Sequence, residues 1–377
     1  MNEQTTAPWG NLVGIRPVKR VVKMMNDGLC DEKIETVLKQ DFAVSSEKTA
    51  LAMKIAKVEL EVMKTIPKNA VSLYIDIPFC PSKCVYCSFA SMPVSEMKDF
   101  IEPYLNALYL ELDKIKTIVT DLNLEIVSIY IGGGTPTSIL SLELDNLLYK
   151  ITRTFDLSSL REFTIEAGRP DTITESKLEV MQKYGVDRIS INPQSMNDKT
   201  LEMIGRKHTV EQVYKAFELA KQYNFKCINM DAVTDLEPEN ITVHTMSIKR
   251  AAKLNQDRDF AGLPEDFDVA EMISYAHGKL QNTGYEPYYL YRQKNILGDL
   301  ENTGFSRRNT PGIYNICMME EIRSVLSAGV GAVTKLVRGD RIERIFNVKD
   351  VREYLKRAAE MRERKNYIYE FLNLEVQ

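Results

Sequence analysis

Three cysteines close together near residue 80 are the residues best suited to chemistry in this sequence. Cys80, Cys84 and Cys87 form a C-x3-C-x2-C pattern within IPFCPSKCVYCSF. Thiolates are soft ligands that select iron–sulfur clusters or zinc. A structural zinc usually takes four protein ligands, but Ser88 and Phe89 follow the last cysteine and no histidine lies nearby. Three thiolates instead fit a four-iron cluster that leaves one iron open to a substrate.

An open iron of this kind would support radical chemistry. It could chelate the amino and carboxylate groups of S-adenosylmethionine while an electron enters the sulfonium. The product would be a carbon radical able to remove hydrogen from an unactivated C–H bond. We therefore predict a 4Fe-4S cluster and S-adenosylmethionine as the cofactors. Zinc-binding or coincidental cysteines are the alternative.

The elements that would position these cysteines follow a strand–helix alternation from residue 71 onward. The predicted strands cover 72–78, 126–132, 162–168, 188–194, 227–233 and 240–247. Amphipathic helical patterns between the early strands are typical of βαβ units with right-handed crossovers and a parallel sheet. We expect an α/β fold, a partial (β/α)6 barrel, with ligands at the carboxyl ends of the strands. The cysteine segment directly follows the first strand.

Three regions are expected along the chain. Residues 1–69 form a helical N-terminal extension, 70–247 the core barrel, and 248–377 an α+β C-terminal region on the substrate side. One connection is unusual, because only AVTDLEPEN separates Asp231 from Ile241. A parallel crossover needs about a dozen residues or more. Either the sixth strand is wrong or a helix is missing here.

Composition limits the partners of the chain. Its 377 residues carry a net charge of −4 with a pI near 5.7, which provides no basic footprint for nucleic acid. We find no run of eighteen apolar residues and no secretion signal, so we expect no membrane span and a cytoplasmic location. Cys30, Cys227 and Cys317 stand alone and are expected to be small buried hydrophobic residues rather than ligands.

Several motifs resemble one enzyme family. They are YIDIPFCPSKCVYC, YIGGGTPT, TIEAGRP, RISINPQSM, LEMIGRKHT and INMD. The cysteine pattern resembles the radical S-adenosylmethionine superfamily. The wider motifs resemble its oxygen-independent coproporphyrinogen III oxidase (dehydrogenase) family, with the Bacillus- and Clostridium-type branch most similar. The resemblance runs from about Trp9 to the C-terminus.

The resemblance implies a role for particular residues. Cys80, Cys84 and Cys87 would ligate the cluster. The residues implied to contact S-adenosylmethionine are Tyr74, Gly132, Gly133, Gly134, Thr135, Glu166, Gln194, Arg206 and Asp231. The glycines would let the backbone approach the methionine end, although a tight turn after the strand is the alternative. His208 is interpreted as a packing or capping residue, and no catalytic residue is assigned.

The chain departs from the family pattern after Asp231. It reads DAVTDLEPEN where the family has D-L-I-x-G-L-P, so we expect one loop and helix to be deleted. The segment before Cys80 is also expected to be too short for the additional N-terminal domain of the most similar branch. The sequence therefore predicts a shortened member of the family.

The substrate implied by the resemblance is coproporphyrinogen III, which carries four propionates. Buried carboxylates require charge-assisted donors. Tyr288 and Arg292 are the candidates, within a cluster that also holds Tyr285, Tyr289, Tyr291 and Lys294. Flavodoxin or ferredoxin would supply electrons. The alternatives are a radical methyltransferase acting on haem, a haem chaperone, and an inactive cluster-binding relative.

Overall fold

The computed structural model describes residues 7–12, 14–231, 235–256, 266–307 and 309–373. Its internal contacts divide the chain into two compact units, each made of two segments of sequence. The first unit comprises Met1–Thr65 and Asp231–Glu320, and the second comprises Ile66–Met230 and Glu321–Gln377. The functional division predicted at residues 69 and 247 stays a prediction.

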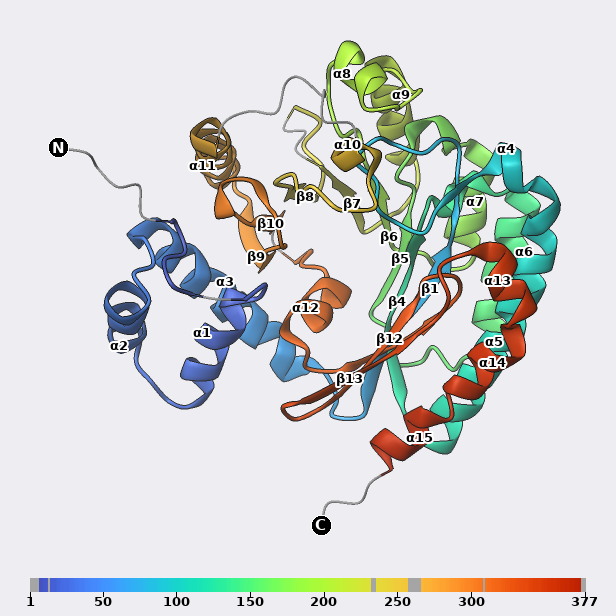
Figure 1. Cartoon of the computed structure of the whole chain (residues 1–377), viewed down its shortest axis with the longest axis horizontal. Helices are drawn as coiled ribbons and strands as arrows, with labels where there is room; N and C mark the ends of the chain where they lie inside the picture. Colours follow the sequence, from blue (N-terminus) through green and yellow to red (C-terminus); the bar gives the residue numbers. More distant parts are fainter. Residues whose placement is uncertain (1–6, 13, 232–234, 257–265, 308, 374–377) are drawn as a thin grey trace. The chain divides into compact units, whose positions relative to one another are not determined.

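The second unit is built around a sheet whose central strands run parallel (Figure 1). Its strands in spatial order are β13 (Arg341–Phe346), β12 (Val333–Arg338), β11 (Ser324–Ala328), β1 (Ala70–Ile77), β4 (Glu125–Gly133), β5 (Glu162–Glu166), β6 (Arg188–Ile191) and β7 (Cys227–Met230). From β11 to β7 each strand pairs parallel with the next, whereas β12 and β13 form an antiparallel hairpin beside β11. The carboxyl ends of the parallel strands lie at one edge, where loops can form a site.

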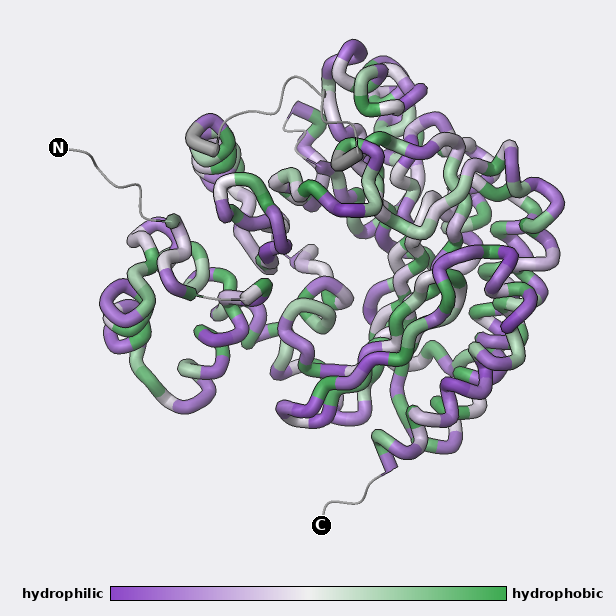
Figure 2. The backbone as a smooth tube through the Cα atoms, viewed as in Figure 1, coloured by the Kyte–Doolittle hydropathy of each residue, from purple (hydrophilic) through white to green (hydrophobic). Residues whose placement is uncertain are grey.

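Helices connect the successive parallel strands and cover one side of the sheet. They are α5 (Ile101–Asp121), α6 (Ser141–Thr154), α7 (Glu175–Lys183) and α9 (Val210–Ala220). α5 packs beside α6, and α6 beside α7 (Figure 1). Hydrophobic and hydrophilic residues alternate along these helices in Figure 2, and α5 buries Leu108, Leu112 and Ile115. The same amphipathic pattern predicts these helices from the sequence.

Shorter elements complete the second unit. They are β2 (Phe79–Cys80), β3 (Met92–Pro93), α4 (Val94–Met97), α8 (Asp198–Met203), α13 (Val351–Lys356), α14 (Ala358–Arg364) and α15 (Tyr367–Leu372), with 3-10 turns η2 (Lys98–Phe100), η3 (Pro136–Ser138) and η4 (Pro170–Thr172). The C-terminal segment of this unit folds as three short helices, α13, α14 and α15. α13 and α14 both pack against α5.

A buried ion pair joins α5 to the C-terminal helices. Glu111 and Lys365 are both fully enclosed, and the Lys365 Nζ atom lies 3.1 Å from Glu111 Oε1. The Tyr354 hydroxyl donates to Glu111 Oε2 at 2.5 Å, and the Asn347 amide donates to Oε1 at 2.8 Å. The backbone N–H of Gly329 donates to Oε2 at 3.0 Å. Buried charges need such partners, so this network fixes the turn after β11 against α5.

The first unit combines helices with a small antiparallel sheet. Its helices are α1 (Pro17–Asn26), α2 (Asp31–Thr36), α3 (Ser46–Thr65), α10 (Lys253–Gln256), α11 (Asp266–Asn282) and α12 (Ile313–Glu320), with the π-helical turn η1 (Val37–Asp41) and the 3-10 turn η5 (Leu297–Asp299). Its strands are β8 (Asn240–Val243), β10 (Asn302–Ser306) and β9 (Glu286–Tyr291), paired antiparallel in that order. α1 and α3 pack together.

The α/β fold predicted from the sequence is confirmed, and each predicted strand coincides with an observed one. The strand predicted at 240–247 forms as β8. It pairs antiparallel with β10 and is not preceded by a crossover helix among the described residues. Residues 232–234 of the short connection lie outside the described residues, and 235–239 contain no helix.

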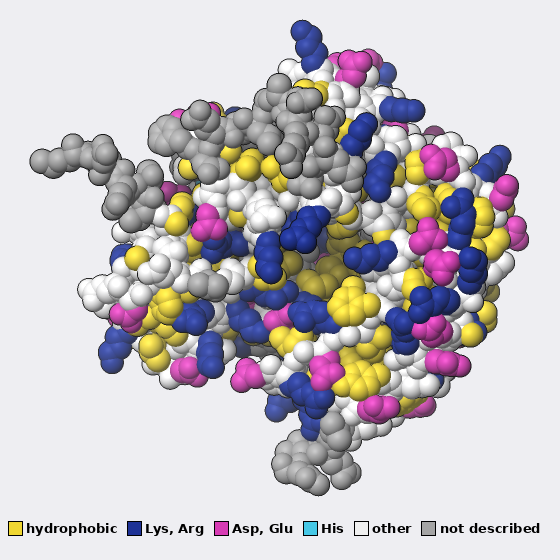
Figure 3. Space-filling view, in the orientation of Figure 1, with side chains coloured by type: hydrophobic (Ala, Val, Ile, Leu, Met, Phe, Trp, Pro, Cys, Tyr) yellow, Lys and Arg dark blue, Asp and Glu magenta, His cyan; other side chains and the backbone are white. Residues whose placement is uncertain are grey.

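The surface and the helices agree with the composition. In the part of the chain that the structure describes, no helix is long and apolar enough to cross a membrane. Lys and Arg side chains and Asp and Glu side chains are both present on the face drawn in Figure 3. This mixture of signs accords with the net charge of −4.

Candidate functional site

The three clustered cysteines lie on a loop that leaves the carboxyl end of β1. Both ends of this loop are tied together, because β2 pairs parallel with β3. The Cys80 sulfur lies 3.4 Å from the Thr135 hydroxyl, which belongs to the turn after β4. Cys84 is buried, and Cys80 and Cys87 are partly buried free thiols. The sequence thus places three thiols from one loop at the functional edge of the sheet.

A second loop supports the cysteine loop from the side of β6. The backbone N–H of Val85 donates to the Ile204 carbonyl at 3.1 Å, and the Ser82 hydroxyl donates to the Gly205 carbonyl at 3.1 Å. Among the described residues, no three His, Cys, Asp or Glu side chains converge as a single metal ion would require. A cubane places a different iron against each thiolate, so its ligands need not converge on one point.

The glycine turn that ends β4 passes closely between neighbouring groups. Gly133 has a φ of +107°, and a Cβ atom there would lie 2.5 Å from an oxygen of Asp76. A Cβ atom on Gly134 would lie 3.0 Å from the Cys80 sulfur. One on Gly132 would lie 3.0 Å from an oxygen of Glu166. Only glycine fits these positions, so the backbone itself lines the space beside the first cysteine.

Two carboxyl groups flank this turn, of which Asp76 is buried and Glu166 is partly buried. The Tyr74 hydroxyl donates to Asp76 Oδ2 at 3.2 Å, and the Tyr130 hydroxyl donates to Glu166 Oε1 at 2.5 Å. Burial raises the pKa of Asp76 well above its usual range, and the nearby Glu166 charge raises it further. Burial also raises the pKa of Glu166 to about 7 despite the hydrogen bonds from Tyr130 and the Gly133 backbone. The second oxygen of Asp76 has no hydrogen-bond partner in the described structure. A cation bound here would favour the ionised form of both groups.

Arg206 joins three of the strand-end loops. Its guanidinium donates to the Gly168 carbonyl at 2.8 Å, the Asn192 carbonyl at 3.0 Å and the Tyr86 hydroxyl at 3.1 Å. Gln194 follows β6 with an exposed side chain and a left-handed φ of +67°. These contacts keep the loops after β5 and β6 against the cysteine loop.

Comparison with known proteins decides the family. Residues 74–243 match the model of the Radical SAM superfamily. The chain is 40% identical over 375 residues to the oxygen-independent coproporphyrinogen-III oxidase-like protein HemZ of Bacillus subtilis, covering 93% of this chain and 75% of that protein. The chain belongs to this radical SAM family. Its members use a 4Fe-4S cluster and S-adenosylmethionine, which are therefore the cofactors of this chain, as predicted.

This radical SAM protein is also similar to two further known proteins. The haem chaperone HemW of Bacillus subtilis is 36% identical over 187 residues, which cover 49% of this chain and 48% of HemW. The structure of coproporphyrinogen III oxidase (HemN) from Escherichia coli superposes with a TM-score of 0.61 at 20% identity. That superposition covers 80% of this chain and 72% of HemN, and it confirms the fold.

The side chains of this radical SAM protein fit both cofactors. Three thiols on one loop can supply three ligands to a cubane, which leaves one iron without a protein thiolate. At neutral pH S-adenosylmethionine carries a sulfonium and an ammonium group. Asp76 provides a buried carboxyl group and Glu166 a partly buried one, and neither forms an ion pair with a described residue. The unpartnered oxygen of Asp76 is the observation that most directly indicates a cationic ligand.

Asp76 and Tyr130 were not singled out from the sequence. A detectable signal existed for Asp76, because SLYIDIP places one acidic residue inside an otherwise apolar strand, two positions after Tyr74. Residues i and i+2 share one face of a strand. Tyr130 lies on β4 and stacks on Tyr74 with ring centroids 6.1 Å apart, a pairing that no local pattern shows.

Three predicted site residues belong to the first unit instead. Asp231 is buried, and the residues that follow it lie outside the described ones. Tyr288 is buried, and its hydroxyl accepts a hydrogen bond from the Asn315 amide at 3.1 Å. Arg292 donates to the Leu12 carbonyl at 3.0 Å and pairs with Asp299. Their roles in binding cofactor or substrate stay predictions.

His208 is a buried histidine of the second unit. Its Nε2 atom lies 3.3 Å from the Pro193 carbonyl, and its Nδ1 atom lies 3.9 Å from an Asp171 oxygen. Burial lowers the pKa of His208 to about 4, so the ring is neutral at pH 7.

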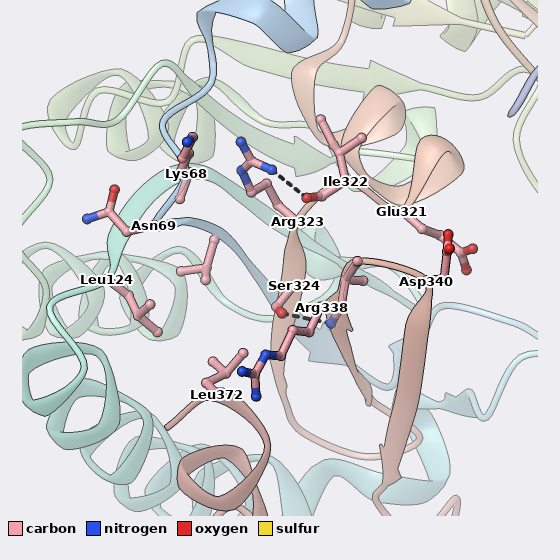
Figure 4. A pocket seen from close by; sticks show the side chains of 14 residues that line it. Lys68, Asn69, Leu124, Glu321, Ile322, Arg323, Ser324, Arg338, Asp340 and Leu372 are labelled. Atoms are coloured by element: carbon pink, nitrogen blue, oxygen red, sulfur yellow. Dashed lines mark hydrogen bonds between the residues drawn. The ribbon is translucent and has the colours of Figure 1, made fainter. Parts of the chain in front are cut away.

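A cavity of about 580 Å³ lies at the other end of the strands (Figure 4). Its wall includes the first residues of β1 and β11, together with Lys68, Arg323 and Arg338. The Arg323 guanidinium donates to the Pro67 and Ile322 carbonyls at 2.6 and 2.7 Å. Because ligands of parallel sheets gather at the carboxyl ends, we do not assign the cofactors to this cavity.

Proposed function

We propose that this chain converts coproporphyrinogen III to protoporphyrinogen IX by oxygen-independent oxidative decarboxylation. The observation that carries the proposal is 40% identity, over 93% of the chain, to a coproporphyrinogen-III oxidase-like protein. The cysteine loop at the carboxyl edge of a parallel sheet supports it, because that edge is where such folds bind ligands.

In this proposal the second unit holds the cofactors. Cys80, Cys84 and Cys87 ligate the cluster. S-adenosylmethionine contacts Tyr74, Gly133, Gly134, Thr135, Glu166, Gln194 and Arg206. When bound, the two cofactors supply a carbon radical that removes a hydrogen atom from an unactivated C–H bond. Asp76 adds a buried carboxyl group beside the glycine turn, where it would hold positive charge.

The substrate would be anchored through its propionates. Arg292 and Tyr288 are the proposed donors, since the guanidinium fork matches a carboxylate. Each reacting propionate loses one hydrogen atom, one carbon dioxide and one electron to become a vinyl group. Two such reactions consume two molecules of S-adenosylmethionine. A flavodoxin- or ferredoxin-like protein would supply the electron for each cleavage, and an acceptor of one electron takes up the electron released.

Anaerobic turnover tests the proposal directly. Reconstituted protein is reduced and incubated with S-adenosylmethionine, with and without coproporphyrinogen III. We expect 5′-deoxyadenosine to form and the product to be lighter by two carbon dioxide molecules and four hydrogen atoms. Cleavage without vinyl products, or a product heavier by a methyl group, would reject this substrate assignment.

A haem chaperone is the second candidate, favoured by the 36% identity to HemW over about half of the chain. It predicts stoichiometric haem binding and transfer to an apoprotein, without consumption of S-adenosylmethionine. Mixing the haem-loaded chain with an apo-haemoprotein and following the Soret band distinguishes the two candidates. Turnover of coproporphyrinogen without haem transfer would exclude the chaperone.

The raised pKa of Glu166 predicts how cofactor binding depends on pH. A cation beside this carboxyl group binds best when the group is ionised, and its pKa is about 7 in the free protein. Below pH 7 the affinity for S-adenosylmethionine should therefore fall by up to about tenfold per pH unit, and above pH 8 it should level off. Equilibrium dialysis of the cluster-loaded protein measures this dependence.

Two variants check that Glu166 is responsible. Glu166→Gln should bind more weakly at pH 8 and lose the pH dependence between 6 and 8. Tyr130→Phe removes the hydrogen bond that lowers the pKa of Glu166, so the levelling-off should move to higher pH. An unchanged pH profile in Glu166→Gln would contradict the assignment.

A further inference from the structure

A buried arginine lies against one cysteine of the loop. Arg169 follows β5 and is only 2% exposed. Its Nη1 atom lies 4.0 Å from the Cys84 sulfur, within hydrogen-bond reach of a thiolate. The same nitrogen lies 3.2 Å from the Ser82 hydroxyl and 3.4 Å from the Ser82 carbonyl. The guanidinium therefore faces the cysteine loop.

The charges around Cys84 do not cancel at the sulfur. Arg169 pairs with Asp171 through its Nε atom at 3.2 Å, on the side away from Nη1, and Asp171 is partly exposed to solvent. The charge of Cys84 acts on Tyr86, whose hydroxyl accepts from the Arg206 guanidinium at 3.1 Å. Arg169 therefore places a positive charge at Cys84, and Arg206 places a second one at the nearby Tyr86.

Cys80 has a different environment. The Thr135 hydroxyl, a neutral group, lies 3.4 Å from its sulfur. The two cysteines therefore differ, because a positively charged side chain lies beside Cys84 whereas the hydroxyl beside Cys80 is neutral.

We propose that Arg169 is a positioning residue that tunes the reduction potential of the cluster. The inference rests on the proposed ligation by Cys84. Reduction adds one negative charge to a cluster that already carries three thiolates. A buried guanidinium that donates to a ligating sulfur stabilises the reduced state more than the oxidised state, and hydrogen bonds to sulfur are a known determinant of cluster potential. Arg169 thereby makes the electron needed for cofactor cleavage easier to deliver.

A matched pair of substitutions tests this inference. Arg188 is also buried, and its Nη1 atom lies 2.9 Å from the sulfur of Cys227, which is outside the cysteine loop. We compare Arg169→Gln with Arg188→Gln in the full chain after anaerobic reconstitution. Iron and sulfide content and the midpoint potential, from a redox titration followed by electron paramagnetic resonance, are measured without S-adenosylmethionine.

Arg169→Gln should lower the ratio of reduced to oxidised cluster at a fixed potential by about tenfold, which corresponds to about 59 mV for one electron. Arg188→Gln should keep the wild-type potential. Ser82→Ala should also keep it, because that change removes a loop contact and retains the guanidinium. A wild-type potential in Arg169→Gln with full iron content overturns the inference.

Two further results are decisive. If Arg169→Gln retains no iron, Arg169→Lys takes its place, since the shorter ammonium group can pair with Asp171 without reaching Cys84. A lowered potential in Arg169→Lys supports the inference, and a wild-type potential overturns it.

If the wild-type chain itself binds no cubane, the proposed ligation fails. A wild-type cubane whose potential is insensitive to Arg169 overturns the tuning role alone.

Discussion

Serine in place of Cys84 is expected to abolish both cluster assembly and cleavage of S-adenosylmethionine. An alkoxide is a harder and much more basic ligand than a thiolate, so the iron at that corner of the cubane loses its protein ligand. We expect 5′-deoxyadenosine formation to fall by at least about 100-fold, the loss typical of removing only an outer partner of a metal ligand. Cys80→Ser and Cys87→Ser should behave alike.

The chain provides its own control for this result. Cys30, which the sequence predicts to be buried, is instead an exposed free thiol outside the loop, so Cys30→Ser should keep the iron content and rate of the wild type. Iron analysis and product quantification on the same reconstituted samples decide the matter. Full cluster content in Cys84→Ser would show that another group is the third ligand.

Removal of Glu111 should strongly destabilise the second unit. In Glu111→Ala the ammonium of Lys365 stays buried without its partner, and the Tyr354 hydroxyl loses its acceptor. Breaking a buried pair in this way costs about 3–5 kcal/mol of unfolding free energy. Urea denaturation of the full chain should show an earlier transition for the second unit.

A double variant separates loss of a charge from loss of packing. Glu111→Leu with Lys365→Met replaces both charges by apolar groups of similar volume, which is often neutral or stabilising. Its unfolding free energy should lie above that of Glu111→Ala, because no buried ammonium is left unpaired, but below the wild type, because the Tyr354 hydroxyl and the Gly329 N–H still lack their acceptor. Equal destabilisation of the single and double variants would contradict the ion-pair explanation.

The sequence was informative where a short segment carries its own signal. The cysteine loop, the β-branched strands and the amphipathic helices were predicted because neighbouring residues determine them. β11 was missed, since SVLSA has only five residues, three of them Ser or Ala, and its partner β1 lies far away in the chain. Local patterns contain no such pairing.

Besides long-range strand pairing, the direction in which side chains point could not be predicted from the sequence. GYEPYYLYRQKN groups aromatic and charged residues, but the sequence does not show that Tyr288 and Arg292 bond within the first unit to Asn315 and Leu12. Arg169 stood in the quoted TIEAGRP segment without a role. Its approach to Cys84 depends on two loops folding against each other.

The pairing of β1 with β11 has a consequence for biosynthesis. Val71 pairs with Ser324, so one edge of the strand that precedes the cysteines stays open until most of the chain has left the ribosome. An open strand edge invites pairing with other chains, and long-range pairings form slowly. An iron–sulfur cluster inserted before translation ends would therefore enter a chain whose sheet still lacks β11. A nascent chain that stalls before residue 324 should depend on chaperones and fail to mature its cluster.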